Sequence, residues 1–178
     1  IRDSHRGNPP AMSPMNTLPA NQCLNRRPLY LLADIGGTNA RFAFVERDNP
    51  LPQPIATYAV EEFPSFDDVL DQLEADWLEL QQQDAVLEGA CLAVAAIPEQ
   101  REISFTNNAW RFTAASVATR LGCEQISIIN DFAAVARALP ALTADHLEAI
   151  GGGEAVPHKP MVAIGPVSYT HLRAHETG

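Results

Sequence analysis

Hydrophobic and polar positions alternate in the first third of the chain in a way that predicts three successive strands. Residues 30–33 form a short apolar run, and residues 41–45 place two phenylalanines on one face, which is the pattern of a half-buried strand. Residues 55–60 are a third candidate strand, after a proline-rich turn at residues 49–52. Strands that follow one another through short turns form an antiparallel meander.

A stripe of apolar side chains at helical spacing predicts the first helix over residues 66–82. The members of the stripe recur every three or four positions: Phe66, Val69, Leu70, Leu73, Trp77 and Leu80. Ser65 stands where an N-cap is expected, and Asp67 and Asp68 fall in the first turn, where the helix dipole favours negative charge. The remaining acidic residues of this helix are expected on a solvated face rather than in a cation site.

Three shorter helices are predicted further along, over residues 114–121, 132–139 and 144–150. Gly122 is a natural stop for the first of them. Pro140 ends the second, because proline interrupts the helical hydrogen bonds. Thr143 stands where the cap of the third is expected.

The remaining apolar runs predict buried strands. These runs cover residues 89–96, 126–129 and 161–164, and residues 101–105 alternate as a shorter strand. Strands and helices therefore follow one another along the chain. This order indicates a mixed α/β fold, with the meander at one edge of a partly parallel sheet.

The charge and the cysteine pattern narrow the classes of partner. A formal net charge of −10 argues against nucleic acid and against an anionic membrane surface. The three cysteines, Cys23, Cys91 and Cys123, lie far apart and form no C-x-x-C pair, so neither a disulfide framework nor a zinc site is indicated. No apolar run approaches the length of about 18 residues that a membrane helix needs, and no signal peptide is recognisable. We expect a cytoplasmic location.

The turn at residues 34–39, Asp-Ile-Gly-Gly-Thr-Asn, has chemistry as well as geometry. Consecutive glycines leave no side chain between the peptide N–H groups and a ligand, and a concave run of such groups suits phosphate oxygens. Thr38 adds a hydroxyl donor, and Asp34 places a carboxylate where a nucleotide-bound Mg²⁺ needs an oxygen ligand. The same residues also suit a plain hairpin turn, and they match neither a Walker A loop nor a dinucleotide fingerprint. Both interpretations stay open.

Asn130-Asp131 is the second candidate, because it follows a predicted buried strand and opens a helix. Open α/β sheets bind ligands at this end of their strands. A carboxylate there can accept a proton from a substrate hydroxyl, while an asparagine binds neighbouring hydroxyls. The alternative is that Asp131 only caps its helix.

Thr106 and Asn107 also follow a predicted strand. Their hydroxyl and amide groups suit a polyol ligand, and they suit an ordinary turn equally well. Trp110 is predicted to lie in the core rather than to stack on a sugar. His146 and His158 have no partner at metal or triad spacing and are assigned no role.

Three stretches carry a family resemblance. They are ADIGGTNAR at residues 33–41, SFTNNAW at residues 104–110, and ISIINDFAAVARALP at residues 126–140. Together, in this order, they resemble the bacterial glucokinases of the proteobacterial type, within the superfamily of sugar kinases, actin and Hsp70, over residues 29–165. The resemblance implies a ribonuclease H-like (actin-like ATPase) mixed sheet with a β-meander and flanking helices.

The resemblance also implies the activity and its residues. The family phosphorylates glucose to glucose 6-phosphate with ATP and Mg²⁺, and the full-length protein is expected to be a homodimer. The first ATP-phosphate loop would consist of Ala33, Asp34, Ile35, Gly36, Gly37 and Thr38, with Asp34 near Mg²⁺. Asn130 would bind glucose hydroxyls, Asp131 would be the base facing the 6-hydroxyl, and Thr106 and Asn107 would form the sugar-side turn.

Four segments are expected along the chain. They are a disordered, partly non-native leader at 1–28, an N-terminal lobe at 29–139, a connector and the start of a second lobe at 140–165, and a non-native tail at 166–178. The natural start is expected at Met12 or Met15.

The chain departs from the family pattern at two places. The glycine that usually follows the central strand is missing from residues 96–101, and no Gly-Thr-Gly phosphate loop follows residue 165. We therefore expect the chain to be inactive alone. Two alternatives stay open, a sugar-responsive transcriptional regulator of the ROK group and a kinase for another hexose.

Overall fold

The computed structural model describes residues 27–80, 85–98, 101–106, 108–153, 156 and 159–165. The chain divides into two compact units, Ile1–Asp131 and Phe132–Gly178. Residues 1–26 and 166–178, for which a disordered leader and a non-native tail are predicted, lie outside the described residues.

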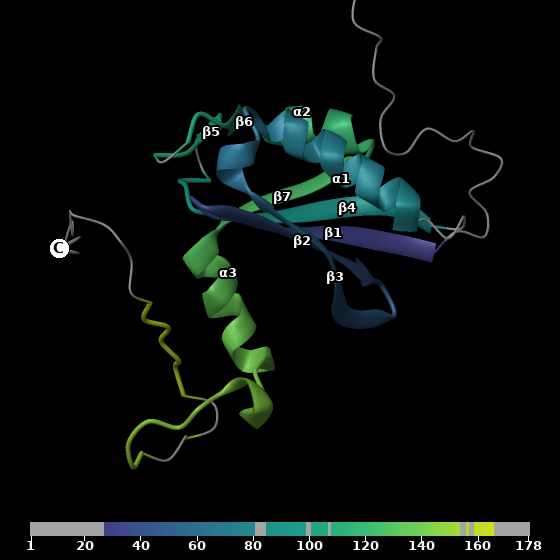
Figure 1. Ribbon diagram of the computed structural model, residues 1–178. Coiled ribbons are helices and arrows are strands. Elements are labelled where there is room, and N and C mark those ends of the chain that lie inside the picture. Colours follow the sequence, from purple (N-terminus) through teal and green to yellow (C-terminus); the bar gives the residue numbers. More distant parts are fainter. Residues whose placement is uncertain are drawn as a thin grey trace, which may run out of the picture. The chain divides into compact units, whose positions relative to one another are not determined.

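A five-stranded sheet forms the centre of the first unit (Figure 1). Its strands are β1 (Arg27–Ile35), β2 (Asn39–Glu46), β3 (Asn49–Ala59), β4 (Ala85–Val94) and β7 (Gln125–Asn130). The order across the sheet is β3-β2-β1-β4-β7. β1, β2 and β3 pair antiparallel, while β1, β4 and β7 are parallel to one another. The predicted meander at one edge of a partly parallel sheet is therefore confirmed.

Two helices and a small hairpin complete the first unit. The helices are α1 (Phe66–Leu80) and α2 (Ala114–Leu121), and the hairpin strands are β5 (Ile103–Ser104) and β6 (Arg111–Phe112). A 3-10 turn, η2 (Val60–Glu62), joins β3 to the segment that leads into α1. Figure 1 shows α1 and α2 over the same face of the sheet. Helix α2 ends, as predicted, at Gly122, whose φ of 65° lies in the left-handed region that glycine adopts readily.

The core lies between the sheet and these helices. The stripe of α1 supplies Phe66, Val69, Leu70 and Leu73, all buried, and they pack with inward-facing residues of β1, β2 and β4. The start of α1 is capped as predicted, because Ser65 Oγ accepts from the backbone N–H of Asp68 at 3.2 Å. Asp68 Oδ2 in turn accepts from the backbone N–H of Ser65 at 2.9 Å, which completes a reciprocal cap.

One local prediction within this unit is wrong. Residues 49–52 were expected to form a turn, but they are the first part of β3. The turn lies instead at Arg47 and Asp48. Proline lacks a donor for the sheet ladder, which is tolerated at an edge. β3 is an edge strand, so the prolines do not interrupt it.

The second unit contains less regular structure. Helix α3 (Asp131–Ala138) begins at the last residue of the first unit, and two 3-10 turns follow, η3 (Leu139–Ala141) and η4 (Ala144–His146). The helix predicted over residues 144–150 is wrong, because only this single turn forms and its surroundings bury no side chain. The strand predicted at residues 161–164 is also absent from the described part of the unit, where no neighbouring strand offers the hydrogen bonds that a strand requires.

A helix that crosses a membrane needs about 20 consecutive, predominantly apolar residues. Within the described ranges, no helix has the length and apolar character needed to cross a membrane.

Candidate active site

The Gly-Gly turn connects the paired ends of β1 and β2. Asp34 lies opposite Arg41 in the antiparallel register, and their side chains form an ion pair with Nη1 and Oδ2 3.0 Å apart. The backbone N–H of Gly36 donates to the carbonyl of Asn39 at 2.9 Å and closes the turn. Among the described residues, positive φ values occur at Gly122 and Gly151 and not at the two glycines of this turn. These glycines are therefore not required for a positive φ. They matter because they place no side chain over the peptide groups.

Two hydrogen bonds hold this turn from neighbouring elements. The carbonyl of Thr38 accepts from the backbone N–H of Val60 in η2 at 2.9 Å, and the carbonyl of Ile35 accepts from that of Ala95, after β4, at 3.1 Å. In both bonds the turn contributes only a backbone carbonyl, which accepts the hydrogen bond. The position of the turn is thus fixed without engaging the side-chain hydroxyl of Thr38, which is exposed.

Asn130 lies at the same edge of the sheet as the turn. Ile35 of β1 is level with Val94 of β4, and Val94 is level with Asn130 of β7. The three strands are parallel, so their carboxyl ends open on one edge, which is where ligands bind in such sheets. The structure therefore brings together two motifs that are about 90 residues apart in sequence.

The environment of Asn130 and Asp131 is polar and partly covered. The Nδ2 of Asn130 donates to the carbonyl of Ala96 at 3.4 Å, which connects the ends of β7 and β4. Asp131 is half-buried and is the first residue of α3. The carboxylate therefore lies in the first turn of α3, at the N-terminal end of the helix. That position is compatible both with a structural carboxylate and with a catalytic base.

The third motif lies in the loop between β5 and β6. Thr106 is exposed, and Asn107 lies outside the described residues. Trp110 is 1% exposed, and its Nε1 donates to the carbonyl of Phe63 at 2.8 Å. The prediction that Trp110 belongs to the core is confirmed.

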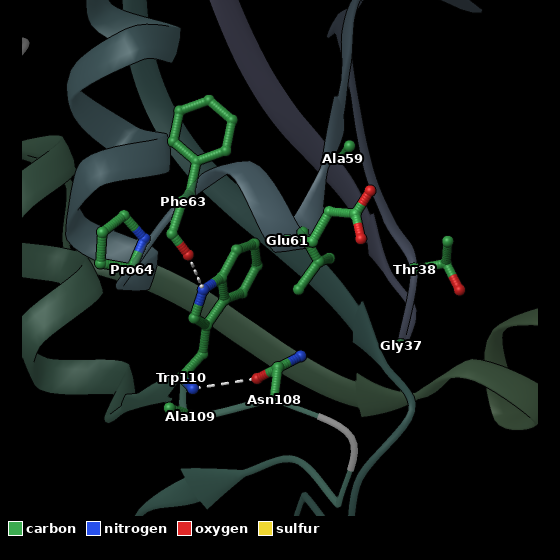
Figure 2. A pocket seen from close by; sticks show the side chains of 10 residues that line it. Gly37, Thr38, Ala59, Glu61, Phe63, Pro64, Asn108, Ala109 and Trp110 are labelled. Carbon is green, nitrogen blue, oxygen red and sulfur yellow. Dashed lines mark hydrogen bonds between the residues drawn. The ribbon is translucent and has the colours of Figure 1, made fainter.

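A cavity of about 450 Å³ lies between this loop and the Gly-Gly turn. Figure 2 shows Asn108 and Trp110 on one side of it and Gly37 and Thr38 on the other. The sequence did not single out Asn108 or Glu61, which also line the cavity. An Asn-Asn pair is common in turns, and a single glutamate carries no local signal, so only the packing identifies them.

A metal centre requires several ligand side chains close together. No group of three or more His, Cys, Asp or Glu side chains among the described residues is arranged to hold a metal ion. The Asp34 carboxylate at the turn is 54% exposed and pairs with Arg41 through one oxygen. It can therefore contribute a single ligand to an ion whose other ligands come from a nucleotide and water, as is usual for Mg²⁺.

Comparison with known proteins gives consistent results. The family model described as Glucokinase matches residues 31–168. Glucokinases of Photorhabdus laumondii and Cronobacter sakazakii are each 36% identical over 135 residues, a match that covers 76% of this chain and 40% of the relative. A crystal structure of glucokinase from an Antarctic psychrotroph matches with a TM-score of 0.57 at 29% identity, covering 72% of this chain and 40% of that one.

These similarities confirm the actin-like α/β fold that the sequence resemblance implied. They extend over most of this chain, which spans 40% of the length of the two relatives. The roles of Ala33 to Thr38, of Thr106 and Asn107, and of Asn130 and Asp131 remain predictions.

Proposed function

The chain belongs to the glucokinase family, and from this premise we propose that the full-length protein transfers the γ-phosphoryl group of ATP to the 6-hydroxyl of glucose. The observation that carries the proposal is the row Ile35, Val94 and Asn130 across the parallel strands. It sets the Gly-Gly turn and Asp131 at one edge of the sheet. A phosphoryl donor and a hydroxyl acceptor have to meet in this way for an in-line transfer.

Each motif has a role in this proposal. The peptide groups from Ala33 to Thr38, with the exposed Thr38 hydroxyl, bind the phosphates of ATP. Asn130 binds hydroxyls of the sugar, and Asp131 orients the 6-hydroxyl and accepts its proton. Thr106 and Asn107 contact the sugar from the loop after β5.

Asp34 is the residue proposed to lie near Mg²⁺. Its carboxylate is exposed at the turn, and Mg²⁺ commonly takes one or two carboxylates together with phosphate oxygens. When bound, the ion neutralises charge on the phosphates. The ion pair with Arg41 restrains the Asp34 carboxylate and limits the positions that this carboxylate can occupy.

Most of the rate acceleration in such transfers comes from positioning and charge neutralisation. The rigid parts of the first unit fit this requirement, because both motifs end strands of one sheet whose inner face is packed. The chain itself is proposed to be inactive alone, since it spans 40% of the length of the two glucokinase relatives.

Substitution of Asp131 by asparagine in the full-length protein tests the proposal. We expect kcat for glucose phosphorylation to fall by about 10²- to 10⁴-fold, the usual contribution of a general base, with little change in the KM for ATP. Asp67→Asn is the matched control, because Asp67 is also an acid in the first turn of a helix but lies in α1; its kcat should be unchanged. Equal kcat values for Asp131→Asn and the wild type would refute the role of Asp131.

Two further assays accompany this test. Phosphorylation rates measured with glucose, mannose and fructose identify the sugar that accepts the phosphoryl group. The residues of this chain do not distinguish among these sugars. Formation of glucose 6-phosphate by the 178-residue chain, at a rate that Asp131→Asn abolishes, would contradict the proposal that the chain is inactive alone.

A further inference from the structure

Gly165 packs against the aromatic ring of Phe132 within the second unit. A Cβ built on Gly165 would lie 2.8 Å from Cζ of the ring and 2.9 Å from its Cε1. Carbon atoms in ordinary contact are about 3.5–4.0 Å apart. The ring therefore occupies the space that a side chain at position 165 would need, and the contact in this form requires glycine.

The requirement for glycine at position 165 comes from the ring and not from the backbone. Among the described residues, positive φ values occur at Gly122 and Gly151, so alanine can adopt the backbone conformation of residue 165. Gly152 is different, because no heavy atom of the described residues lies within 4 Å of a Cβ built there. A methyl group is thus harmless at Gly152, whereas at Gly165 it displaces the Phe132 ring.

Phe132 follows the proposed base directly and lies in the first turn of α3. This helix has eight residues, and none of its side chains is buried. A helix of this length is marginal without tertiary contacts, and the ends of helices fray first. The first turn of α3 therefore needs anchors, and the packing of the Phe132 ring on Gly165 provides one.

We propose that Phe132 and Gly165 act as a positioning pair for the carboxylate of Asp131. The inference rests on the proposed function, in which Asp131 orients the 6-hydroxyl and accepts its proton. When the ring is held against Gly165, the first turn keeps one backbone conformation, and the Asp131 carboxylate keeps one direction.

The chemistry of a general base explains why such an anchor matters. A base must lie within about 2.6–3.2 Å of the group whose proton it removes. A displacement of about 1 Å that originates away from the reacting atoms can lower the rate by about 10²-fold. Freedom in the first turn of α3 would therefore reduce the rate although every catalytic side chain is still present.

Gly165→Ala in the full-length protein tests the pair. We expect kcat to fall by about 10- to 100-fold, with little change in the KM for ATP. The melting temperature should change little, because the Phe132 side chain is already 38% exposed and can turn outward. Gly152→Ala introduces the same methyl group where it meets no neighbour, so its kcat should equal that of the wild type. A purely structural role would instead lower the melting temperature and leave the kcat of the folded enzyme unchanged.

A double variant shows whether the pair acts through the base. Gly165→Ala added to Asp131→Asn should lower kcat no further, because the carboxylate that would be misplaced is already absent. Independent effects would multiply in the double variant. Multiplied losses would show that Gly165 acts on something other than Asp131 and would overturn the proposal.

Phe132→Leu keeps the test valid if Gly165→Ala folds poorly. Leucine has no Cζ or Cε1 atom, so it cannot make the contact, and kcat should fall to a similar extent. In the 178-residue chain, a nuclear Overhauser effect between the ring protons of Phe132 and the α-protons of Gly165 reports the contact without any need for activity. It should be present in the wild type and lost in Gly165→Ala.

These results separate the positioning pair from the proposed function. Wild-type kcat in both Gly165→Ala and Phe132→Leu, or the absence of the Overhauser effect in the wild type, would overturn the positioning pair alone. Wild-type kcat in Asp131→Asn would overturn the proposed base and the positioning pair together.

Discussion

Single residues of this chain show that polar and aromatic side chains near a predicted site can serve the core instead. Trp110 follows the polar pair Thr106-Asn107 in sequence, yet it is buried and bound to the carbonyl of Phe63. Its neighbour Asn108 holds the same loop through the Trp110 backbone and turns its amide to the cavity. The loop is therefore anchored by the tryptophan, while the side chain of Asn108 lines the cavity.

Tyr58 is expected to make the stability of the first unit fall at alkaline pH. This buried residue of β3 donates its hydroxyl to Asp76 Oδ2 of α1 at 2.6 Å. Burial, and then the hydrogen bond to Asp76, raise the pKa of Tyr58 far above its ordinary value. The folded state thus favours the protonated form. The stabilisation is complete below the unfolded pKa of about 10 and is lost as the pH rises above it.

Urea unfolding of the chain and of Tyr58→Phe at a series of pH values from about 8 to 11 measures this effect. The phenylalanine variant keeps the ring in the core and has no group to titrate. Its free energy of unfolding should therefore decline less steeply above pH of about 10. Parallel declines in the two proteins would show that Tyr58 does not contribute.

At the scale of elements, Arg120 joins the two helices that cover the sheet. It lies in α2, and its Nη2 pairs with Asp71 and, at 2.8 Å, with Glu74 Oε2, both in α1. The Arg120 side chain is only 14% exposed. Two carboxylates of one helix therefore hold a single guanidinium of the other in a place that water reaches poorly, where such pairs matter more than at the surface.

Arg120→Met is expected to lower the free energy of unfolding by about 1–3 kcal/mol, below the roughly 3–5 kcal/mol of a fully buried pair because the carboxylates are partly exposed. The loss leaves Asp71 and Glu74 side by side without a cation. Arg111→Met is the matched control, since Arg111 and Glu102 are 3.9 Å apart and both exposed; its effect should stay within about 0.5 kcal/mol. Equal effects of the two substitutions would contradict the proposed linkage of the helices.

At the scale of the whole molecule, the two units differ in how they bury apolar groups. All members of the core cluster belong to the first unit. In the described part of the second unit no side chain is buried, and large apolar residues such as Ile150, Val162 and Ile164 are 96%, 80% and 92% exposed. Hydrophobic burial therefore stabilises the first unit and contributes little to the second.

Hydrogen exchange of the chain should reproduce this difference. Backbone amides of β1 and β4, which are paired on both sides, are expected to exchange slowest, at rates that follow global unfolding. Amides of residues 142–153 should exchange nearly as fast as in an unstructured peptide, because they lie outside any helix longer than one turn. Strong protection across residues 142–153 would show that the second unit has a stable core of its own.

The sequence by itself determined the order of the main elements and the two motifs at the sheet edge. Periodicity is a local property, so the helical stripe of α1 and the apolar runs of β1, β4 and β7 could be predicted from the pattern of residues along the sequence alone. The local pattern gave a wrong prediction at residues 49–52. Proline is tolerated in a strand that lies at the edge of a sheet, and the local sequence does not show whether a strand has a neighbour on both sides. The prediction of a strand at 161–164 was wrong because the local sequence does not show whether a neighbouring strand is present to pair with it.

Only the tertiary structure decided what lies around the Gly-Gly turn. The sequence marked the turn as suited to phosphate, with a plain hairpin as the alternative. Register then set it level with Asn130 across three parallel strands. Packing of the turn, the end of β3 and residues 108–110 made the adjoining cavity and left the Asn108 amide without a partner. Such features depend on contacts between residues far apart in the chain, which no local pattern specifies.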